Sequence, residues 1–474
     1  MTAPAATDIR PALPGEPEYA RAAAVFNEAS PARPAAALTA RTVAEVRAAV
    51  RYGRTAGLPV RVHTTGHSAG AARPMDGQLL IRTELGGGVR VDPARRTAWI
   101  PAGTRWAEVV AAAAGHGLAA AHGTSPTVGA VGYLLRGGVS LYGRRTGIAA
   151  NGVTAVEVVT ADGEVRRVDA GHEPELLWAL RGGGGGLGVV TGVELELFPA
   201  AGVVTGAAFW AGRHAERLLE RWLDWAADAP REVSTSLRIM NLPPVPEIPV
   251  ELRSGPVVCV AGAVLAPAEG DLETAGRQAD DLLGPLRAVA APLEDSWAPG
   301  ATPAVAQAHQ DPPGPVEVLG DHLLVGDLRG EGAAALLRAV GPGSASPLVA
   351  AELRQLGGAL AEPDPRGGAL DHLPAAYAVM AAGLPGLHPA PAIRERCARL
   401  RAALTPWDTG RTAPGFVESP DQPQGHLDEA DIAAVDRVRL AYDPDGLFRP
   451  DAMTGTSDLL RRAFPPTPHH AHEE

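Results

Sequence analysis

The chain begins with an alternation of helical and strand-like apolar patterns. Residues 42–58 predict an amphipathic helix, because apolar side chains recur there every three to four positions: Val43, Val46, Ala49 and Val50. Shorter apolar runs bounded by Gly, Pro or Asp predict strands at 59–62, 79–81, 89–91, 97–100, 153–160, 165–168 and 189–197. Further helices are expected at 106–114 and 174–180. This mixture of elements predicts an α+β fold.

The pattern changes near residue 206. Longer helical patterns occupy 214–227 and 271–283, a strand-like run lies between them at 257–264, and Pro-rich loops appear at 242–249 and 312–315. We therefore predict a second domain, an antiparallel sheet with helices on one face. A last helix is expected at 428–442, so the chain divides into residues 1–205, 206–424 and 425–474.

Composition narrows the classes of function. The 474 residues are 46% apolar, which is enough for two or three packed units. The net charge is −12 and no dense basic run occurs, which argues against nucleic acid as a partner. All 42 basic residues are arginine, and the absence of lysine excludes Schiff-base, pyridoxal phosphate and P-loop chemistry.

The two cysteines and the N-terminus carry no targeting or metal signal. Cys259 and Cys397 lack the spacing of a metal or disulfide site, so both are expected in the core and no metal is expected. The N-terminus lacks a basic stretch followed by an apolar one, and no apolar run approaches ~18 residues. We expect a cytoplasmic protein with no membrane partner.

Three glycine-rich segments lie within the first 200 residues, at 65–68, at 128–138 and at 182–188. None has the GxGxxG spacing of a Rossmann site within a βαβ unit. Glycines still allow backbone N–H groups to approach a phosphate or a flat ring. From these segments alone, a ligand cradle and simple loops are equally good interpretations.

A set of motifs, taken in order along the chain, resembles a known family. The motifs are Leu58-Pro59-Val60-Arg61-Val62 ahead of Thr65-Gly66-His67-Ser68, Ala102-Gly103-Thr104, Thr127-Val128-Gly129, Asn151-Gly152-Val153, Ala161-Asp162-Gly163, Trp178 to Gly185, Tyr442-Asp443-Pro444 and Phe448-Arg449. The first ~200 residues resemble the FAD-binding domain of the vanillyl-alcohol oxidase/PCMH superfamily. The whole chain resembles a bacterial berberine-bridge-enzyme-like oxidase.

The resemblance implies a fold and a cofactor. It implies a PCMH-type FAD-binding domain of two α/β subdomains at 1–205, a substrate domain at 206–424, and a C-terminal segment at 425–474 that returns to the first domain. FAD would be bound covalently through His67, with the pyrophosphate cradled by His63, Thr64, Thr65, Gly66, His67 and Ser68. The other expected cofactor residues are Gly103, Ser125, Val128, Gly129, Gly132, Gly138, Asn151, Gly152, Val153, Gly188, Val189 and Phe448.

The sequence departs from the family pattern at the second attachment point. Many members carry a cysteine that bonds the flavin, and Ser125 occupies that position here. Serine cannot form the thioether, so attachment through His67 alone is expected. His63 and Thr65 replace the usual Arg and Gly, which alters the expected pyrophosphate contacts.

The catalytic position departs as well. The family's usual tyrosine aligns with Phe416, which has no hydroxyl, and a strand would place Glu418 on the same face. Glu418 is the candidate base, and a surface carboxylate in a Pro-rich loop is the alternative. Tyr142 is a second catalytic candidate, although packing or a cofactor contact is the more ordinary role for it, as for Tyr133 and Arg145. Glu352, Arg354 and Tyr377 would line the pocket or lie on an ion-paired sheet face.

The function implied by the resemblance is that of an FAD-dependent oxidase. It would take a hydride from a small substrate, with aromatic or polycyclic natural products as candidates, and O₂ would reoxidise the flavin. Two alternatives remain: a flavin-dependent oxygenase or redox-neutral cyclase on the same scaffold, and a resistance protein that sequesters a small molecule and keeps a vestigial flavin. The expected partners are the substrate and O₂, and the expected state is a monomer or homodimer.

Overall fold

The computed structural model describes residues 9–422 and 425–449. Its first unit is a small parallel sheet. Its strand order is β1 (Ala36–Ala40), β3 (Leu79–Thr83), β2 (Val60–His63). The predicted helix is α2 (Val43–Ala56), which Thr42 caps by accepting from the Glu45 N–H and which ends at Gly57 in the left-handed conformation. Helix α1 (Pro17–Ala23) packs on the same sheet.

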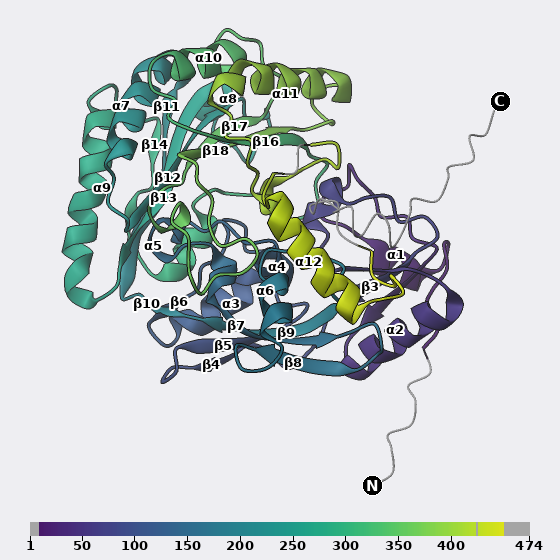
Figure 1. Ribbon diagram of the computed structural model, residues 1–474. Helices are drawn as coiled ribbons and strands as arrows, with labels where there is room; N and C mark the ends of the chain where they lie inside the picture. Colours follow the sequence, from purple (N-terminus) through teal and green to yellow (C-terminus); the bar gives the residue numbers. More distant parts are fainter. Residues whose placement is uncertain (1–8, 423–424, 450–474) are drawn as a thin grey trace, which may run out of the picture.

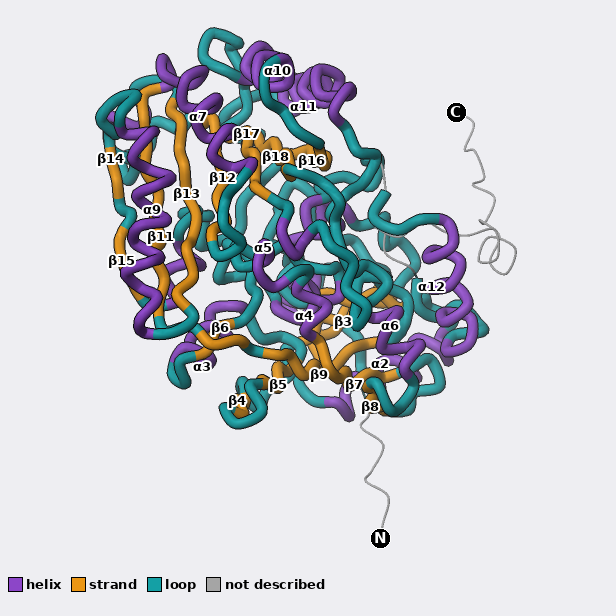
Figure 2. The backbone as a smooth tube through the Cα atoms, turned by 60° about the vertical axis from the view of Figure 1, so that its left-hand side comes forward, coloured by secondary structure: helices purple, strands orange, loops and turns teal. Residues whose placement is uncertain are grey.

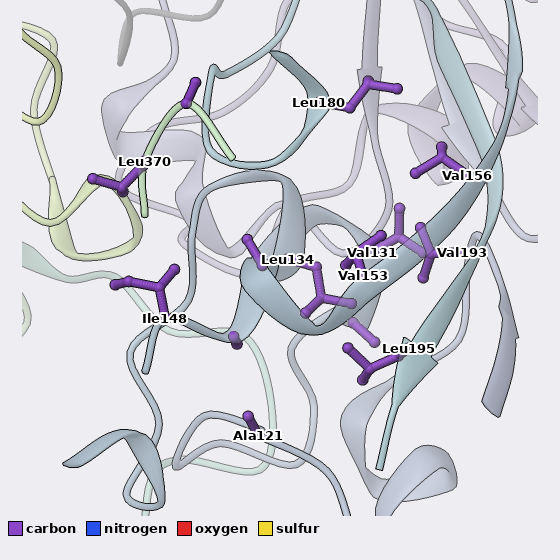
Figure 3. Packing of buried hydrophobic residues seen from close by; sticks show 14 of the residues in the cluster. Ala121, Val131, Leu134, Ile148, Val153, Val156, Leu180, Val193, Leu195 and Leu370 are labelled. Atoms are coloured by element: carbon purple, nitrogen blue, oxygen red, sulfur yellow. The ribbon is translucent and has the colours of Figure 1, made fainter. Parts of the chain in front are cut away.

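The second unit is a five-stranded antiparallel sheet. Its strand order is β4 (Arg90–Asp92), β5 (Thr97–Pro101), β9 (Val189–Glu196), β7 (Val153–Val159), β8 (Val165–Asp169). Its helices are α3 (Trp106–Ala114), α4 (Ala130–Leu135) and α6 (Pro174–Leu180), and a further short helix, α5 (Gly143–Thr146), contacts residues 358–360. Figure 3 shows Leu134 of α4 among side chains of β7 and β9. This packing fixes α4, and with it the glycine loop that precedes it. A two-stranded ladder joins β6 (Leu118–Ala119) to β10 (Phe198–Pro199).

The third unit is a large antiparallel sheet covered by helices. Its strand order is β14 (Glu294–Asp295), β11 (Gly202–Ala211), β13 (Val257–Ala266), β12 (Val233–Met240), β17 (Ala350–Gln355), β18 (Tyr377–Gly383), β16 (Leu319–Val325), with β15 (Ala298–Gly300) beside β11. Its long helices, α7 (Ala215–Ala227), α9 (Leu272–Arg287), α10 (Glu331–Val340) and α11 (Ala390–Leu404), lie on the outer side of the sheet (Figures 1 and 2). A short helix, α8 (Val250–Arg253), follows β12. The predicted α+β fold with a helix-covered antiparallel sheet is confirmed.

The C-terminal segment returns to the first two units, as Figure 1 shows. Helix α12 (Glu429–Tyr442) contacts α6, and the Val60 N–H donates to the Leu447 carbonyl at 2.7 Å. Of the expected domain boundaries, residue 205 falls inside β11, and residue 424 lies outside the described residues. Across 9–422 and 425–449, no helix is long and apolar enough to cross a membrane.

Candidate functional site

A cavity of about 960 Å³ is lined by residues of all three units. One wall comes from β2, the 3-10 helix η1 (His67–Ala71), the loop before α4 and the glycine run at 184–188. The opposite wall comes from β12, β16, β17, β18 and the loop at 415–420. Its volume lies near the top of the range of small-molecule sites.

Most of the predicted cofactor residues line this cavity. They are His63, Thr64, Thr65, Gly66, His67, Ser68, Ser125, Val128, Gly129, Gly132, Gly188 and Phe448. The structure places the others behind the wall: Gly103, Gly138, Asn151, Gly152, Val153 and Val189. Segments far apart in the sequence thus meet around one space.

The residues behind the wall support those that line it. A Cβ at Gly138 would lie 2.4 Å from the Tyr133 ring, so Gly138 makes room for a ring that lines the cavity. A Cβ at Gly103 would lie 2.7 Å from the Glu84 Cα, which indicates a close backbone crossing. The Asn151 amide donates to the Asp371 carbonyl at 2.8 Å.

His67 reaches the cavity because of a glycine before it. Gly66 has φ of 70°, and a Cβ there would lie 2.7 Å from the Val25 Cα. The His67 ring stacks on Phe26 at 3.8 Å and hydrogen-bonds through Nδ1 with the Thr65 hydroxyl at 2.8 Å. Burial and then Arg105 lower the His67 pKa to about 4. The imidazole is therefore neutral at pH 7 and keeps a lone pair for bond formation.

A row of hydroxyl groups connects His67 to the position of the missing cysteine. His67 Nε2 lies 3.2 Å from the Thr127 hydroxyl, which lies 3.0 Å from the Ser125 hydroxyl. Both cysteines, Cys259 and Cys397, are buried and free, as predicted, and neither lines the cavity.

The donor set of the first wall suits a dinucleotide. Arg33, Arg61, Arg73 and Arg449 line the part built from the first unit, together with Asp76, the carboxylate among the described residues of this part. Guanidinium groups match a diphosphate in charge and geometry. At Gly132 a Cβ would meet nothing within 4 Å, so this residue presents bare backbone to the cavity. These features fit FAD.

The glycine run is held from behind by helix α12. Arg439 donates to the carbonyls of Gly183 at 2.6 Å and Gly185 at 3.0 Å. Its guanidinium is also paired with Asp436, and both side chains are buried. The C-terminal segment therefore fixes one edge of the site.

The opposite wall carries a group of polar side chains, of which the sequence analysis named Glu352 and Arg354 but not Arg238 and Asp311. Glu352 and Arg354, which alternate on β17, are ion-paired at 3.0 Å and also line the cavity. The Arg354 guanidinium lies 5.1 Å from the Phe416 ring. Arg238 and Asp311 lie in the same wall, and burial raises the Asp311 pKa. No sequence signal separated Arg238 from the other arginines or Asp311 from its Pro-rich loop.

Glu418 faces the cavity, although the strand that was expected around it does not form. Pro414–Phe416 form a 3-10 helix, η8, and Glu418 follows in a loop, because Pro414 and Gly415 favour a turn over an extended run. The Glu418 side chain nevertheless lines the cavity close to Phe416. Burial raises the Glu418 pKa to about 7, and Arg136 opposes this effect.

Of the remaining polar candidates, Tyr133 lines the cavity, whereas Tyr142, Arg145 and Tyr377 do not. Tyr142 lies between His122 and Phe198, with ring centroids at 5.5 and 5.2 Å, and is absent from the lining. Its position corrects the catalytic prediction to a packing role. Arg145 pairs with Glu232 at 3.4 Å, and Tyr377 packs on Trp222. Within 9–422 and 425–449 no cluster of His, Cys, Asp or Glu could hold a metal ion.

Comparisons with known proteins agree with this geometry. Residues 34–169 match the family model of an FAD binding domain. The chain is 34% identical over 166 residues to (R)-6-hydroxynicotine oxidase of Paenarthrobacter nicotinovorans, covering 35% of this chain and 36% of that protein. It is 32% identical over 213 residues to glucooligosaccharide oxidase of Sarocladium strictum, covering 44% and 42%. The aligned regions thus span well under half of these two relatives.

Solved structures extend the likeness to nearly the whole chain. The crystal structure of 6-hydroxy-D-nicotine oxidase from Arthrobacter nicotinovorans superposes with a TM-score of 0.78 at 23% identity, covering 94% of this chain and 97% of that one. BBE-like 1 of Physcomitrella patens gives a TM-score of 0.78 at 21% identity, covering 93% and 95%.

Residues 34–169 thus form an FAD binding domain, and the chain as a whole has the same fold as 6-hydroxy-D-nicotine oxidase and BBE-like 1. The expected family resemblance is confirmed at this level.

Proposed function

We propose that this chain is an FAD-dependent oxidase that removes a hydride from a small substrate, with O₂ as the final electron acceptor. One observation carries the proposal: a single cavity brings together the FAD-matching wall with His67 and an opposite wall with a half-buried carboxylate, Glu418. The names of the relatives, which include oxidases of a nicotine derivative and of oligosaccharides, support the reaction class.

The first wall would hold the cofactor. When bound, FAD supplies a two-electron acceptor for the hydride. The arginines of the first unit would hold the diphosphate, and Gly129, Gly132 and the run at 184–188 would allow backbone contact with the ring. His67, neutral and cavity-lining, would carry the covalent bond, and Ser125 would leave it as the single attachment.

The opposite wall would handle the proton and the substrate. Glu418 has a pKa of about 7, so near pH 7 about half of the protein molecules carry it as a carboxylate, which can accept a proton from a substrate hydroxyl. Phe416 and Arg354 offer a flat apolar and cationic surface, which suits an aromatic or polycyclic substrate. Asp311 and Glu352 would orient its polar groups.

The test uses the purified yellow protein. Candidate substrates are mixed with it under anaerobic conditions, and bleaching of the flavin absorption reports hydride transfer. We expect bleaching by at least one small hydroxylated aromatic or alicyclic compound, and one H₂O₂ per turnover in air. Glu418→Gln should slow the bleaching by about 10²-fold or more, the range of general-base contributions.

Each alternative predicts a different result. Turnover without peroxide would indicate an oxygenase or a redox-neutral cyclase, and one relative over 184 residues is named an FAD-dependent monooxygenase. Tight ligand binding without bleaching would indicate a sequestering protein. Protein purified without flavin after expression with excess FAD would refute the proposal.

A further inference from the structure

The loop that carries Glu418 is wedged between two glycines. A Cβ at Gly70 of η1 would lie 2.6 Å from the Glu418 carbonyl oxygen. A Cβ at Gly320 of β16 would lie 3.1 Å from the Glu418 Cγ. The same loop residue therefore rests on the segment of His67 and on the edge strand of the large sheet. A side chain at Gly70 would clash with the loop backbone, and one at Gly320 would clash with the Ala381 carbonyl oxygen at 2.6 Å and press on the Glu418 side chain.

A glutamine amide bridges the loop to the next residue of β16. The Gln422 Oε1 accepts from the Glu418 N–H at 2.6 Å and from the Ser419 N–H at 3.1 Å. The Gln422 Nε2 donates to the Asp321 carboxylate. One side chain thus satisfies two loop donors and connects them to the sheet.

Asp321 is itself held by helix α11. The Arg401 Nε donates to Asp321 Oδ2 at 2.9 Å, and its Nη2 donates to the His322 carbonyl at 2.6 Å. The Asp321 side chain is only 12% exposed. An ion pair of low exposure with further hydrogen bonds is a rigid support.

The start of the loop is bound to the following residue of β16. The Ala413 N–H donates to His322 Nε2 at 3.0 Å, and His322 Nδ1 hydrogen-bonds with the Val379 carbonyl at 2.9 Å. This arrangement requires a neutral ring protonated on Nδ1, and burial lowers the His322 pKa to about 4. Both ends of the Glu418 loop are therefore fixed to β16.

We propose that Gln422, acting through Asp321, is a positioning residue that holds the Glu418 carboxylate in the enclosed part of the cavity. The proposal rests on the proposed function, in which Glu418 is the base. Among the described residues, the charged and titratable groups around the loop include Arg136 from the end of α4, Asp321 and His322 from β16, and Arg401 from α11. Without the Gln422 amide, the Glu418 and Ser419 N–H groups would need water as their acceptor, and water at that position would also solvate the Glu418 carboxylate.

The experiment measures the ionisation of Glu418 without any substrate. The holoprotein is labelled with ¹³C at glutamate carboxyl groups, and the Glu418 signal is assigned by its loss in Glu418→Gln. A pH titration then compares the wild type with Gln422→Ala. We expect an apparent pKa near 7 in the wild type and a fall of about one unit or more toward 4.5 in the variant, since burial is the dominant cause of the elevation.

Matched variants separate positioning from general damage. Asp327→Asn removes another Arg-paired aspartate, whose partner Arg329 lies at 2.9 Å on the surface, and should leave the Glu418 titration unchanged. Asp321→Asn keeps an oxygen that can accept from the Gln422 amide but removes the ion pair with Arg401, so it should shift the titration in the same direction as Gln422→Ala and by less. If Gln422→Ala fails to fold, Asp321→Asn carries the test.

Two outcomes would overturn parts of the scheme separately. A Glu418 pKa in Gln422→Ala within about 0.3 units of the wild type would refute the positioning role, whatever the enzyme does. A wild-type pKa near 4.5 would refute Glu418 as the tuned base, and with it the catalytic part of the proposed function. If the Glu418 pKa falls in Gln422→Ala and the acid limb of the pH profile of flavin reduction moves to lower pH by the same amount, both the positioning role of Gln422 and the catalytic role of Glu418 are supported.

Discussion

Replacing Glu418 by glutamine should stabilise the protein at alkaline pH and leave it unchanged at acid pH. The side chain keeps its size, but it can no longer be ionised in the enclosed cavity. Folding raises the Glu418 pKa from its ordinary 4.5 to about 7. At about 1.4 kcal/mol per pH unit, this difference amounts to about 3 kcal/mol.

The sign follows from proton binding. The folded protein binds the Glu418 proton more tightly than the unfolded chain, so the stability contributed by this group is full below pH 4.5 and is lost as pH rises through 7. The variant lacks this loss. The unfolding free energy of the variant minus that of the wild type should therefore be about 3 kcal/mol larger above pH 8 than near pH 4.5.

Urea denaturation of both holoproteins from pH 4.5 to 8.5 measures this difference, and contributions of all other groups cancel. Glu331→Gln is the control, because its side chain is 85% exposed on α10. A difference that does not change with pH would refute the enclosure of Glu418. If Glu418→Gln gains stability at alkaline pH and also loses flavin reduction, the wild type keeps a destabilising carboxylate because its function needs it.

Three other changes test the cofactor wall. His67→Ala should abolish covalent flavin, so that mass spectrometry of the denatured protein finds only the apoprotein mass; a persisting bond would contradict the single attachment. Ser125→Cys should create a second bond, because Ser125 and His67 contact the same Thr127 hydroxyl at 3.0 and 3.2 Å, and His67→Ala/Ser125→Cys would then retain flavin after denaturation. Arg439→Met should cost up to about 3–5 kcal/mol, because it removes the buried cation that pairs with the buried Asp436, and it should lower the flavin-to-protein ratio; full flavin content would show that the glycine run needs no support from α12.

Local patterns determined much of the fold because they act over a few residues. The helix at 106–114 and the strand at 189–196 were predicted to within a residue or two, since their apolar periods and end signals are local. The antiparallel substrate sheet followed from the change of pattern near residue 206. The cofactor followed from the ordered motif set around His67 rather than from any periodicity.

Local reasoning failed where long-range contacts decide the conformation. Phe416 and Glu418 were expected on a strand, but Pro414 and the anchors on β16 hold them in a turn and loop. Tyr142 was expected near the flavin, but the packing of His122 and Phe198 draws it into the core. Both errors concern side-chain direction, which depends on neighbours distant in sequence.

By itself, the sequence determined the class of fold and the segments that form the first wall of the cavity, and it named His67 as the proposed flavin anchor. These features depend on backbone conformation and residue type, such as Gly66 ahead of His67, and a few neighbouring residues are enough to set both. Only the tertiary structure decided what faces the cavity from the other side. Glu418, Arg354 and Asp311 come from separate segments, and their burial, charge and pKa values exist only once those segments meet.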